Sequence, residues 1–177
     1  MKKVIILLSA LILGVATSCD IFPTETLEPG ETATISMAGE WYVTCDLIDA
    51  NGDVFYSGAD FFGLDERFLI LTYNSAANRQ NEIVVDDLEN FWEFRVKCIA
   101  DIESKTFSIT SGEDYLNGDL VTLTGKIVEN GTTTPSGQPA DYIEITCTFA
   151  SDVYPARYGY AGYRLSGWRN TGFVMDM

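Results

Sequence analysis

The stretch ENFWEFRVKCIAD, residues 89–101, alternates between two kinds of side chain. Every second residue is apolar: Trp92, Phe94, Val96, Cys98 and Ala100. Glu93, Arg95 and Lys97 stand between them. A period of two is typical of a β-strand with one face in an apolar interior and the other in water. The pattern therefore predicts a long strand, and it raises the question whether the interior is a packed core or a cavity for an apolar ligand.

The rest of the chain predicts the same kind of structure. Strand-like runs cover residues 40–48, 53–60, 67–73, 82–86, 91–102, 106–111, 119–129, 140–149 and 157–166. Asn51-Gly52 and Asn117-Gly118 predict tight hairpins with type I′ turns. Asn130-Gly131 opens a predicted loop, because the prolines and glycines after it do not continue a strand. No stretch keeps a helical period, so we predict an all-β, antiparallel, up-and-down barrel of about eight strands, with a sandwich as the alternative.

The first residues predict export and lipidation. Lys2 and Lys3 precede an apolar run, residues 4–15, that is too short to cross a bilayer comfortably. Small residues at 16–18 then lead to Cys19, as in a bacterial lipobox. We predict that residues 1–18 are a signal peptide and that the Cys19 sulfur takes a diacylglycerol. The alternative is an ordinary secretory signal with Cys19 as a bystander.

The predicted lipid anchor also divides the chain. Residues 20–36 carry two prolines and several acids without a period, which indicates a flexible tether. We therefore predict a lipidated, acidic tether over residues 19–37 and a single barrel domain over residues 38–177. The expected location is the bacterial cell envelope, on the periplasmic or surface face of the outer membrane, and we expect a monomer.

The charge balance restricts the partners. The chain has 26 acidic and 11 basic residues, a net charge of −15. Such a chain repels nucleic-acid phosphate and anionic lipid headgroups. We therefore expect no nucleic-acid partner, contact with the membrane through the acyl anchor, and recognition of any bound lipid through its tail.

Three cysteines follow Cys19, and each falls on the apolar phase of a strand pattern. Cys45, Cys98 and Cys147 are therefore predicted to be buried, reduced thiols that pack as small apolar side chains. The alternative is one disulfide between neighbouring strands. A metal site is disfavoured, because the chain has no histidine and no CxxC spacing.

The absence of histidine also removes Ser-His-Asp and Cys-His chemistry. The remaining candidates for hydrolysis are the carboxylates of Asp86, Asp87 and Glu89. They lie between two apolar runs, where polar turn residues are expected, so we predict a solvated turn and assign no catalytic residue. DANGD, residues 49–53, predicts a hairpin turn rather than a calcium loop, because Val54 stands where such a loop needs glycine. We expect no cofactor.

A tyrosine-rich segment, YPARYGYAGYRLSGW, covers residues 154–168. In a strand, Tyr158 and Tyr160 would share one face, and Tyr163 would lie on the other. The segment predicts the last strand of the barrel. The alternative is an exposed aromatic row that stacks on sugar rings, which would make the protein a glycan-binding accessory lipoprotein.

Several segments together resemble a known family, the lipocalin-like lipoproteins described as "lipid-binding putative hydrolase". The block EIVVDDLENFWEFRVK, residues 82–97, is the most specific part of the resemblance. The other segments are AGEWYV (38–43), YNSAAN (73–78), TGKI (124–127), TPSG (134–137) and AGYRLSGW (161–168). The resemblance implies a calycin-type β-barrel in a secreted, lipid-anchored bacterial protein that binds an apolar ligand. It brings no defined catalytic motif, so no catalytic residue is carried over.

We therefore predict an acyl-anchored lipoprotein that binds an apolar or amphipathic, lipid-like small molecule in its barrel. An eight-stranded barrel is either filled by its own side chains or holds one small ligand. The candidate lining consists of the large inward residues: Trp41, Val43, Trp92, Phe94, Val96, Phe107, Ile145 and Phe149.

Overall fold

The computed structural model describes residues 32–57 and 67–177. The predicted signal peptide, Cys19 and residues 58–60 of the predicted second strand lie outside the described residues. The strands are β1 (Gly39–Ile48), β2 (Val54–Ser57), β3 (Phe68–Asn74), β4 (Glu82–Asp86), β5 (Arg95–Asp101), β6 (Thr106–Glu113), β7 (Leu120–Thr133), β8 (Pro139–Phe149) and β9 (Gly162–Arg169). Two short helical segments complete the elements within these described residues, α3 (Tyr154–Tyr158) and η1 (Val174–Asp176).

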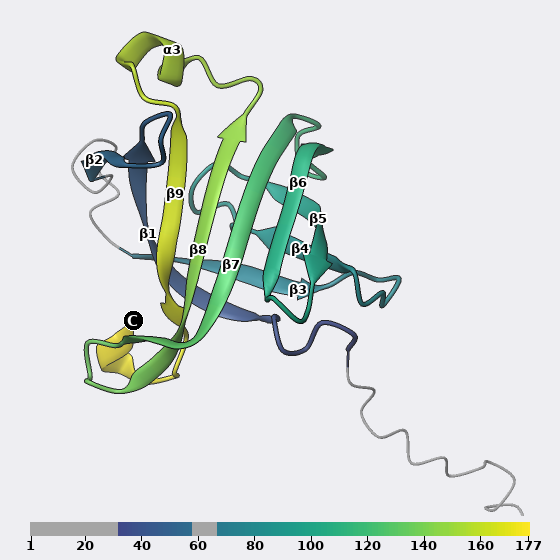
Figure 1. The fold of residues 1–177 in the computed structure, drawn as a ribbon, viewed down its shortest axis with the longest axis vertical. Coiled ribbons are helices and arrows are strands. Elements are labelled where there is room, and N and C mark those ends of the chain that lie inside the picture. The colour runs from purple at the N-terminus through teal and green to yellow at the C-terminus, as the bar shows by residue number, and fades with distance from the viewer. Residues whose placement is uncertain (1–31, 58–66) are drawn as a thin grey trace, which may run out of the picture. The chain divides into compact units, whose positions relative to one another are not determined.

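Eight of these strands close into a barrel. The strands are hydrogen-bonded in the order β2-β1-β3-β4-β5-β6-β7-β8-β9, and β1 also pairs with β9 (Figure 1). Every pairing is antiparallel, and β2 is an additional strand at the side of β1. The structure therefore confirms the predicted antiparallel, up-and-down barrel and not the alternative sandwich.

Strand β1 defines the two ends of the barrel. Its first half pairs with β3 and its last residues pair with β2, while its other edge pairs with β9 over residues 41–48. We call the end where β1 begins the lower end and the end where it finishes the upper end. The lower end carries the β3–β4, β5–β6 and β7–β8 connections and both terminal segments of the described domain. The upper end carries the β1–β2, β4–β5, β6–β7 and β8–β9 connections.

The alternating stretch that predicts the barrel forms β5, but the strand is shorter than predicted. Val96, Cys98 and Ala100 are buried, as the alternation requires. The strand begins at Arg95, whereas the pattern predicts a start near residue 91. Residues 87–94 form a loop instead, in which Glu93 has a φ of 59°, far from the negative values of regular strands.

Both Asn-Gly pairs lie in hairpin connections, as predicted, but the turn type is different. Only the glycine of each pair has a positive φ, 85° at Gly52 and 76° at Gly118, so the prediction of type I′ turns is wrong. In the first hairpin, the Asp49 carboxylate accepts the N–H groups of Asn51 and Asp53 at 2.8 and 2.9 Å. This use of the carboxylate confirms DANGD as a turn.

Two further predictions for the second half of the chain are wrong. Strand β7 continues through Asn130 to Thr133, because Asn130 takes a φ of 49° and forms a bulge, after which pairing resumes at Thr132 with Ala140. Residues 154–158 form the helix α3 rather than the start of a strand, with Pro155 in its first turn and Gly159 in a left-handed conformation at its end. Among the described residues, no helix is long and apolar enough to cross a bilayer.

Candidate functional site

The predicted lining residues lie together at the centre of the barrel. Seven of the eight are buried: Trp41, Val43, Phe94, Val96, Phe107, Ile145 and Phe149. Trp92 is half-buried and packs against this core from the β4–β5 loop. The period-two reading of the strands therefore identified the interior, although the pattern itself does not say whether the interior is hollow.

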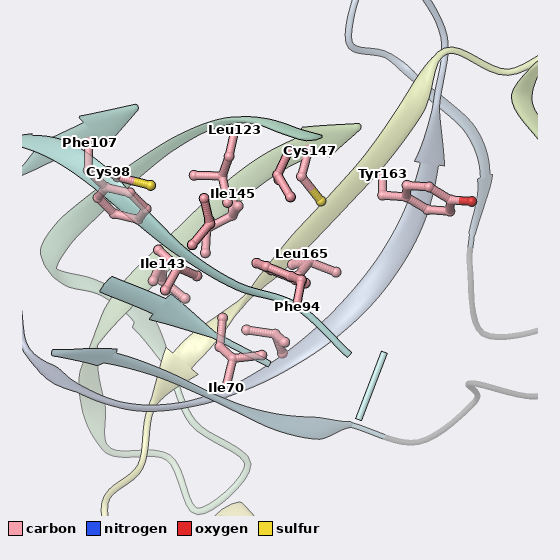
Figure 2. Packing of buried hydrophobic residues seen from close by; sticks show 14 of the residues in the cluster. Ile70, Phe94, Cys98, Phe107, Leu123, Ile143, Ile145, Cys147, Tyr163 and Leu165 are labelled. Carbon is pink, nitrogen blue, oxygen red and sulfur yellow. The ribbon is translucent and has the colours of Figure 1, made fainter. Parts of the chain in front are cut away.

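The middle of the barrel is a packed core. Figure 2 shows side chains from facing strands, among them Ile70, Ile145 and Leu165, filling the space between the walls. A void that holds a water molecule would leave accessible surface on its walls, yet Val43, Ile70, Phe94, Val96, Leu123, Ile143, Ile145 and Leu165 all have 0% of their surface exposed. The protein's own side chains therefore occupy the place where a ligand tail is expected.

The lower end is closed by a hydrogen-bonded cluster around Trp41. The Trp41 indole donates to the Thr72 hydroxyl at 2.8 Å, and this hydroxyl donates to the Met37 carbonyl at 2.6 Å. The Arg169 guanidinium lies over the Trp41 ring, 4.3 Å from its centroid. Met37 belongs to residues 32–37, for which we predict a tether, and these residues form a turn that packs on the lower end.

A buried aspartate, Asp176, holds the C-terminal segment at the same end. Its carboxylate accepts the Ser136 N–H at 2.8 Å, the Ser136 hydroxyl at 3.0 Å and the Thr171 hydroxyl at 2.6 Å. Burial acts to raise the pKa of Asp176, but the hydrogen bonds from Thr171 and Ser136 outweigh it and lower the pKa below its usual value. The ionised carboxylate therefore fits its site.

The upper end is closed in a different way, by rings from the β4–β5 loop. Trp92 stacks on Phe149 with centroids 4.8 Å apart, and Phe91 meets Tyr163 edge-on at 5.1 Å. Phe91 also stacks on Phe68 at 5.9 Å. In the ring of strands, β4 lies opposite β8, so a loop that leaves β4 and contacts Phe149 on β8 crosses the mouth of the barrel.

The β4–β5 loop is organised around a second buried aspartate, Asp87, which has 0% of its surface exposed. Its carboxylate accepts hydrogen bonds at 2.6–3.2 Å from five backbone N–H groups of the loop, those of Glu89, Phe91, Trp92, Glu93 and Phe94. Burial raises the pKa of Asp87, although the N–H donors act to lower it. One side chain therefore replaces the hydrogen bonds that a strand ladder would supply to this segment.

The same loop contains unusual backbone conformations. Leu88, Glu89 and Glu93 have φ values of 54°, 62° and 59°, in the left-handed region that residues with a Cβ rarely adopt. Such conformations persist only where surrounding contacts hold them. Here the contacts are the Asp87 hydrogen bonds and the packing of Phe91 and Trp92.

The family model described as "Lipid-binding putative hydrolase" matches residues 26–174. The chain belongs to this lipid-binding family. No curated protein matches the chain. A solved structure of a protein of unknown function from Bacteroides ovatus is 12% identical, with a TM-score of 0.42. The match covers 77% of this chain but only 42% of that one, and a likeness this low supports no conclusion about function.

The hydrolase half of the family description directs attention to the carboxylates after β4. Asp86 and Asp87 are 2% and 0% exposed, so the prediction of a solvated turn is wrong for both. Asp86 accepts the Tyr73 hydroxyl at 3.0 Å and the Arg95 Nε at 2.7 Å. Asp87 is occupied by the loop backbone. The two carboxylates therefore hold the loop and the barrel wall.

Tyr158 and Tyr160 do not share one face of a strand, as the alternative of an exposed aromatic row requires. Tyr158 lies in α3, whereas Tyr160 is buried and its hydroxyl lies 2.7 Å from that of Tyr163. The Tyr163 hydroxyl in turn donates to Asp152 at 2.7 Å. Tyr163 points into the barrel, as the strand pattern predicts. Tyr154 and Tyr158 remain exposed on α3 and stack on each other with centroids 6.1 Å apart, so exposed aromatics of this segment lie on a helix and not along a strand.

The three cysteines are buried and unpaired, which contradicts the alternative of a disulfide. Burial raises the pKa of Cys45 and of Cys98 to about 12. It raises the pKa of Cys147 well above its usual value, and the nearby Cys45 and Asp87 add to this rise. Among the described residues, no group of three or more Cys, Asp or Glu side chains could hold a metal ion.

A depression on the outer wall of the barrel differs in character from the interior. It has a volume of about 420 Å³, is open to solvent and follows β5 to β8. Its outward-facing lining is mixed, with Ile99, Lys126 and Glu144 beside several hydroxyl side chains. It includes only Phe107 of the predicted lining residues, so it is not the site to which the sequence pattern points.

Proposed function

We propose that this chain is an exported lipoprotein, held at the cell envelope by an acylated Cys19, that takes up the hydrocarbon tail of an apolar or amphipathic molecule in a calycin-like barrel. Membership of a lipid-binding family and a closed barrel with apolar inward positions support this function. The net charge of −15 supports recognition through the tail rather than through an anionic headgroup. The protein acts as a monomer.

The observation that carries the proposal is the aromatic cluster at the upper end. Trp92 and Phe91 are half-buried there and rest on Phe149 and Tyr163, which belong to the core. Partly hydrated aromatic rings over an apolar interior mark a place where a hydrocarbon chain loses contact with water by packing against that interior. Burial of ten methylenes contributes on the order of 8 kcal/mol before the costs of association.

Binding is tested by titration of the protein with a panel of a monoacylglycerol, a lysophospholipid and a fatty acid of matched chain length. A saturable change in tryptophan fluorescence is expected, and most of it is expected to be lost in Trp92→Phe. The matched control is Trp168→Phe, because Trp168 lies on the outer wall and its indole donates to the Asp176 carbonyl. A wild-type protein that gives no saturable signal with any lipid would contradict the proposal.

The anchor is tested separately in cells that carry the full chain. Wild-type protein is expected in the detergent-extracted membrane fraction and to incorporate a labelled fatty acid, whereas Cys19→Ala is expected in the soluble fraction without label. Cys98→Ala serves as the control, since Cys98 is buried in the barrel. Retention of Cys19→Ala in the membrane fraction would show that the anchor is elsewhere.

A further inference from the structure

We propose that the 88–94 loop is a lid over the portal of the barrel, and that Phe91 and Trp92 occupy the place that a ligand tail takes when the loop moves away. This proposal rests on the proposed function and adds to it the entry route, the residues that close it and the class of headgroup.

The rings of the lid lie where a ligand would enter. Trp92 and Phe91 are attached to the β4–β5 loop, yet they contact Phe149 on β8 and Tyr163 on β9. These strands form the opposite wall, so the two rings bridge the mouth. Phe94 lies directly below and also contacts Phe149, with centroids 5.4 Å apart. Removal of the two rings would therefore open an apolar site lined by aromatic side chains.

The backbone of the lid depends on side chains. Five of its N–H groups donate to the single Asp87 carboxylate. Asn90 Nδ2 also donates to the Leu69 carbonyl at 2.8 Å, and Asn117 Nδ2 donates to the Glu93 carbonyl at 3.4 Å. At the base of the loop, the Leu88 N–H donates to Asp86 at 2.9 Å and the Asp87 N–H donates to the Phe94 carbonyl at 3.1 Å. A segment held in this way opens without breaking the ladder between β4 and β5, which runs from Asp86 and Arg95 downward.

The conformation of the lid favours movement. Leu88 and Glu89 at one end and Glu93 at the other are left-handed, and each of them carries a Cβ. The cost of these conformations is offset only while Asp87 and the aromatic contacts hold the loop closed. Opening relieves the strain, so the closed and open forms differ in free energy by less than the contacts alone would suggest. Hinges at the ends of a loop absorb this kind of change.

The charges around the mouth select the headgroup. Glu89 and Glu93 belong to the lid, and Asp152 lies beside Tyr163 on the opposite side. The Arg95 cation is paired with Asp86. A carboxylate headgroup at this mouth would meet negative charge, which disfavours it. The expected ligand is therefore a hydrocarbon tail with an uncharged or zwitterionic head.

The probe for the test is a monoacylglycerol, with the fatty acid of the same chain length as its anionic counterpart. The double variant Phe91→Ala/Trp92→Ala removes the rings but keeps Asp87 and the backbone N–H groups. We expect it to bind the monoacylglycerol at least tenfold faster than wild type and more tightly. Asp87→Asn is also expected to bind the monoacylglycerol faster than wild type. Asp176→Asn, the matching change at the lower end, is expected to leave the association rate unchanged.

A second measurement reports on the lid directly. The emission of Trp92, obtained as the difference between wild type and Trp92→Phe, is expected to shift to longer wavelength when the monoacylglycerol binds, because the indole moves into water. A shift to shorter wavelength would mean that the ring stays and packs on the ligand, and it would overturn the lid.

The outcomes separate the lid from the proposed function. If wild type and Phe91→Ala/Trp92→Ala bind with the same rate and affinity, the lid is wrong while lipid binding stands. Weaker binding by the double variant would also show that the two rings do not close the portal, while lipid binding itself stands. A fatty acid that binds more tightly than its monoacylglycerol overturns the headgroup assignment. If neither wild type nor either variant binds any of these lipids, both the lid and the proposed function are wrong.

Discussion

The two ends of the barrel are closed by similar residues that are held in opposite ways. Each end has a tryptophan and a buried aspartate, Trp41 and Asp176 at the lower end and Trp92 and Asp87 at the upper end. Trp41 is a strand residue with 0% of its surface exposed, and its indole is hydrogen-bonded to Thr72 on a neighbouring strand. Trp92 lies on a loop and remains half-buried.

The two ends differ in how many strand pairings must break before each can open. To open the lower end, the pairing of β1 with β3 and β9 would have to break, because Trp41 lies in both ladders. To open the upper end, the loop only has to leave Asp87 and the aromatic cluster. Closure by strand residues therefore belongs to the cooperative core, and closure by a loop allows local opening.

The largest expected difference between the ends is in stability. Trp41→Ala should destabilise the fold by about 3–5 kcal/mol, because it empties a fully buried site. Trp92→Ala should cost only about 1–2 kcal/mol, because the ring is already partly hydrated. Urea unfolding of the two variants measures both values. Equal losses would show that the upper end is as much a part of the core as the lower end.

A smaller effect is expected from the two aspartates. Asp87→Asn should cost about 1–3 kcal/mol, because an amide nitrogen cannot accept the N–H groups that now meet a carboxylate oxygen. Hydrogen exchange should increase in residues 88–94 and leave β7 and β8 protected. Asp176→Asn should instead increase exchange near Ser136 and Thr171. The comparison fails if Asp87→Asn loosens the whole barrel evenly.

The pH dependence of stability should separate the same two groups. The pKa of Asp176 is lowered by its hydrogen bonds, so its contribution is present above the ordinary aspartate value of about 3.9 and is lost as the pH falls through the lower folded value. The pKa of Asp87 is raised by burial, so stability falls as the pH rises from that ordinary value through the raised folded value. Denaturation curves of the two Asp→Asn variants across this range should each lose one of these slopes. If neither variant changes the pH dependence of the unfolding free energy, neither aspartate is the cause of that dependence.

The smallest effect concerns thiol reactivity in a Cys19→Ala chain. All three remaining thiols should resist a thiol reagent in the native protein and react once it is denatured, because each is buried with a raised pKa. Cys147 lies near Asp87 beneath the lid, so slow native labelling, located by mass spectrometry, should reach it before Cys98. If Cys98 is labelled first, the mobile end of the barrel is the lower end and not the upper end.

The barrel could be predicted from the sequence because burial on one face of a strand leaves a period of two. Strand β4 begins and ends at the predicted residues, 82 and 86. The inward positions of β5 and of β9, such as Val96 and Leu165, also follow from that period. The Asn-Gly pairs marked two hairpins, since glycine supplies the positive φ that each connection uses.

The upper end could not be predicted in the same way. The alternation runs without a break from Trp92 to Ala100, yet the ladder starts only at Arg95, because the Asp87 carboxylate takes the N–H groups of the preceding residues. A pattern of apolar residues does not record where backbone hydrogen bonds go. The sequence did contain one signal for this loop: Asp87 comes directly after strand β4, and polar residues and then Phe91 and Trp92 follow it. The helix at residues 154–158 did have ordinary signals, Pro155 and Gly159, which the strand interpretation overlooked.

The pairing of the first strand with the last also has a consequence for the order of folding. Trp41 pairs with Arg169, so the barrel closes only after nearly the whole domain has been synthesised. Contacts between residues so distant in the chain form slowly, since a long loop must close first. Until β9 arrives, β1 and β8 present unpaired edges that can join other chains. A domain of this connectivity therefore folds slowly, and a chaperone that covers these two edges would limit its aggregation.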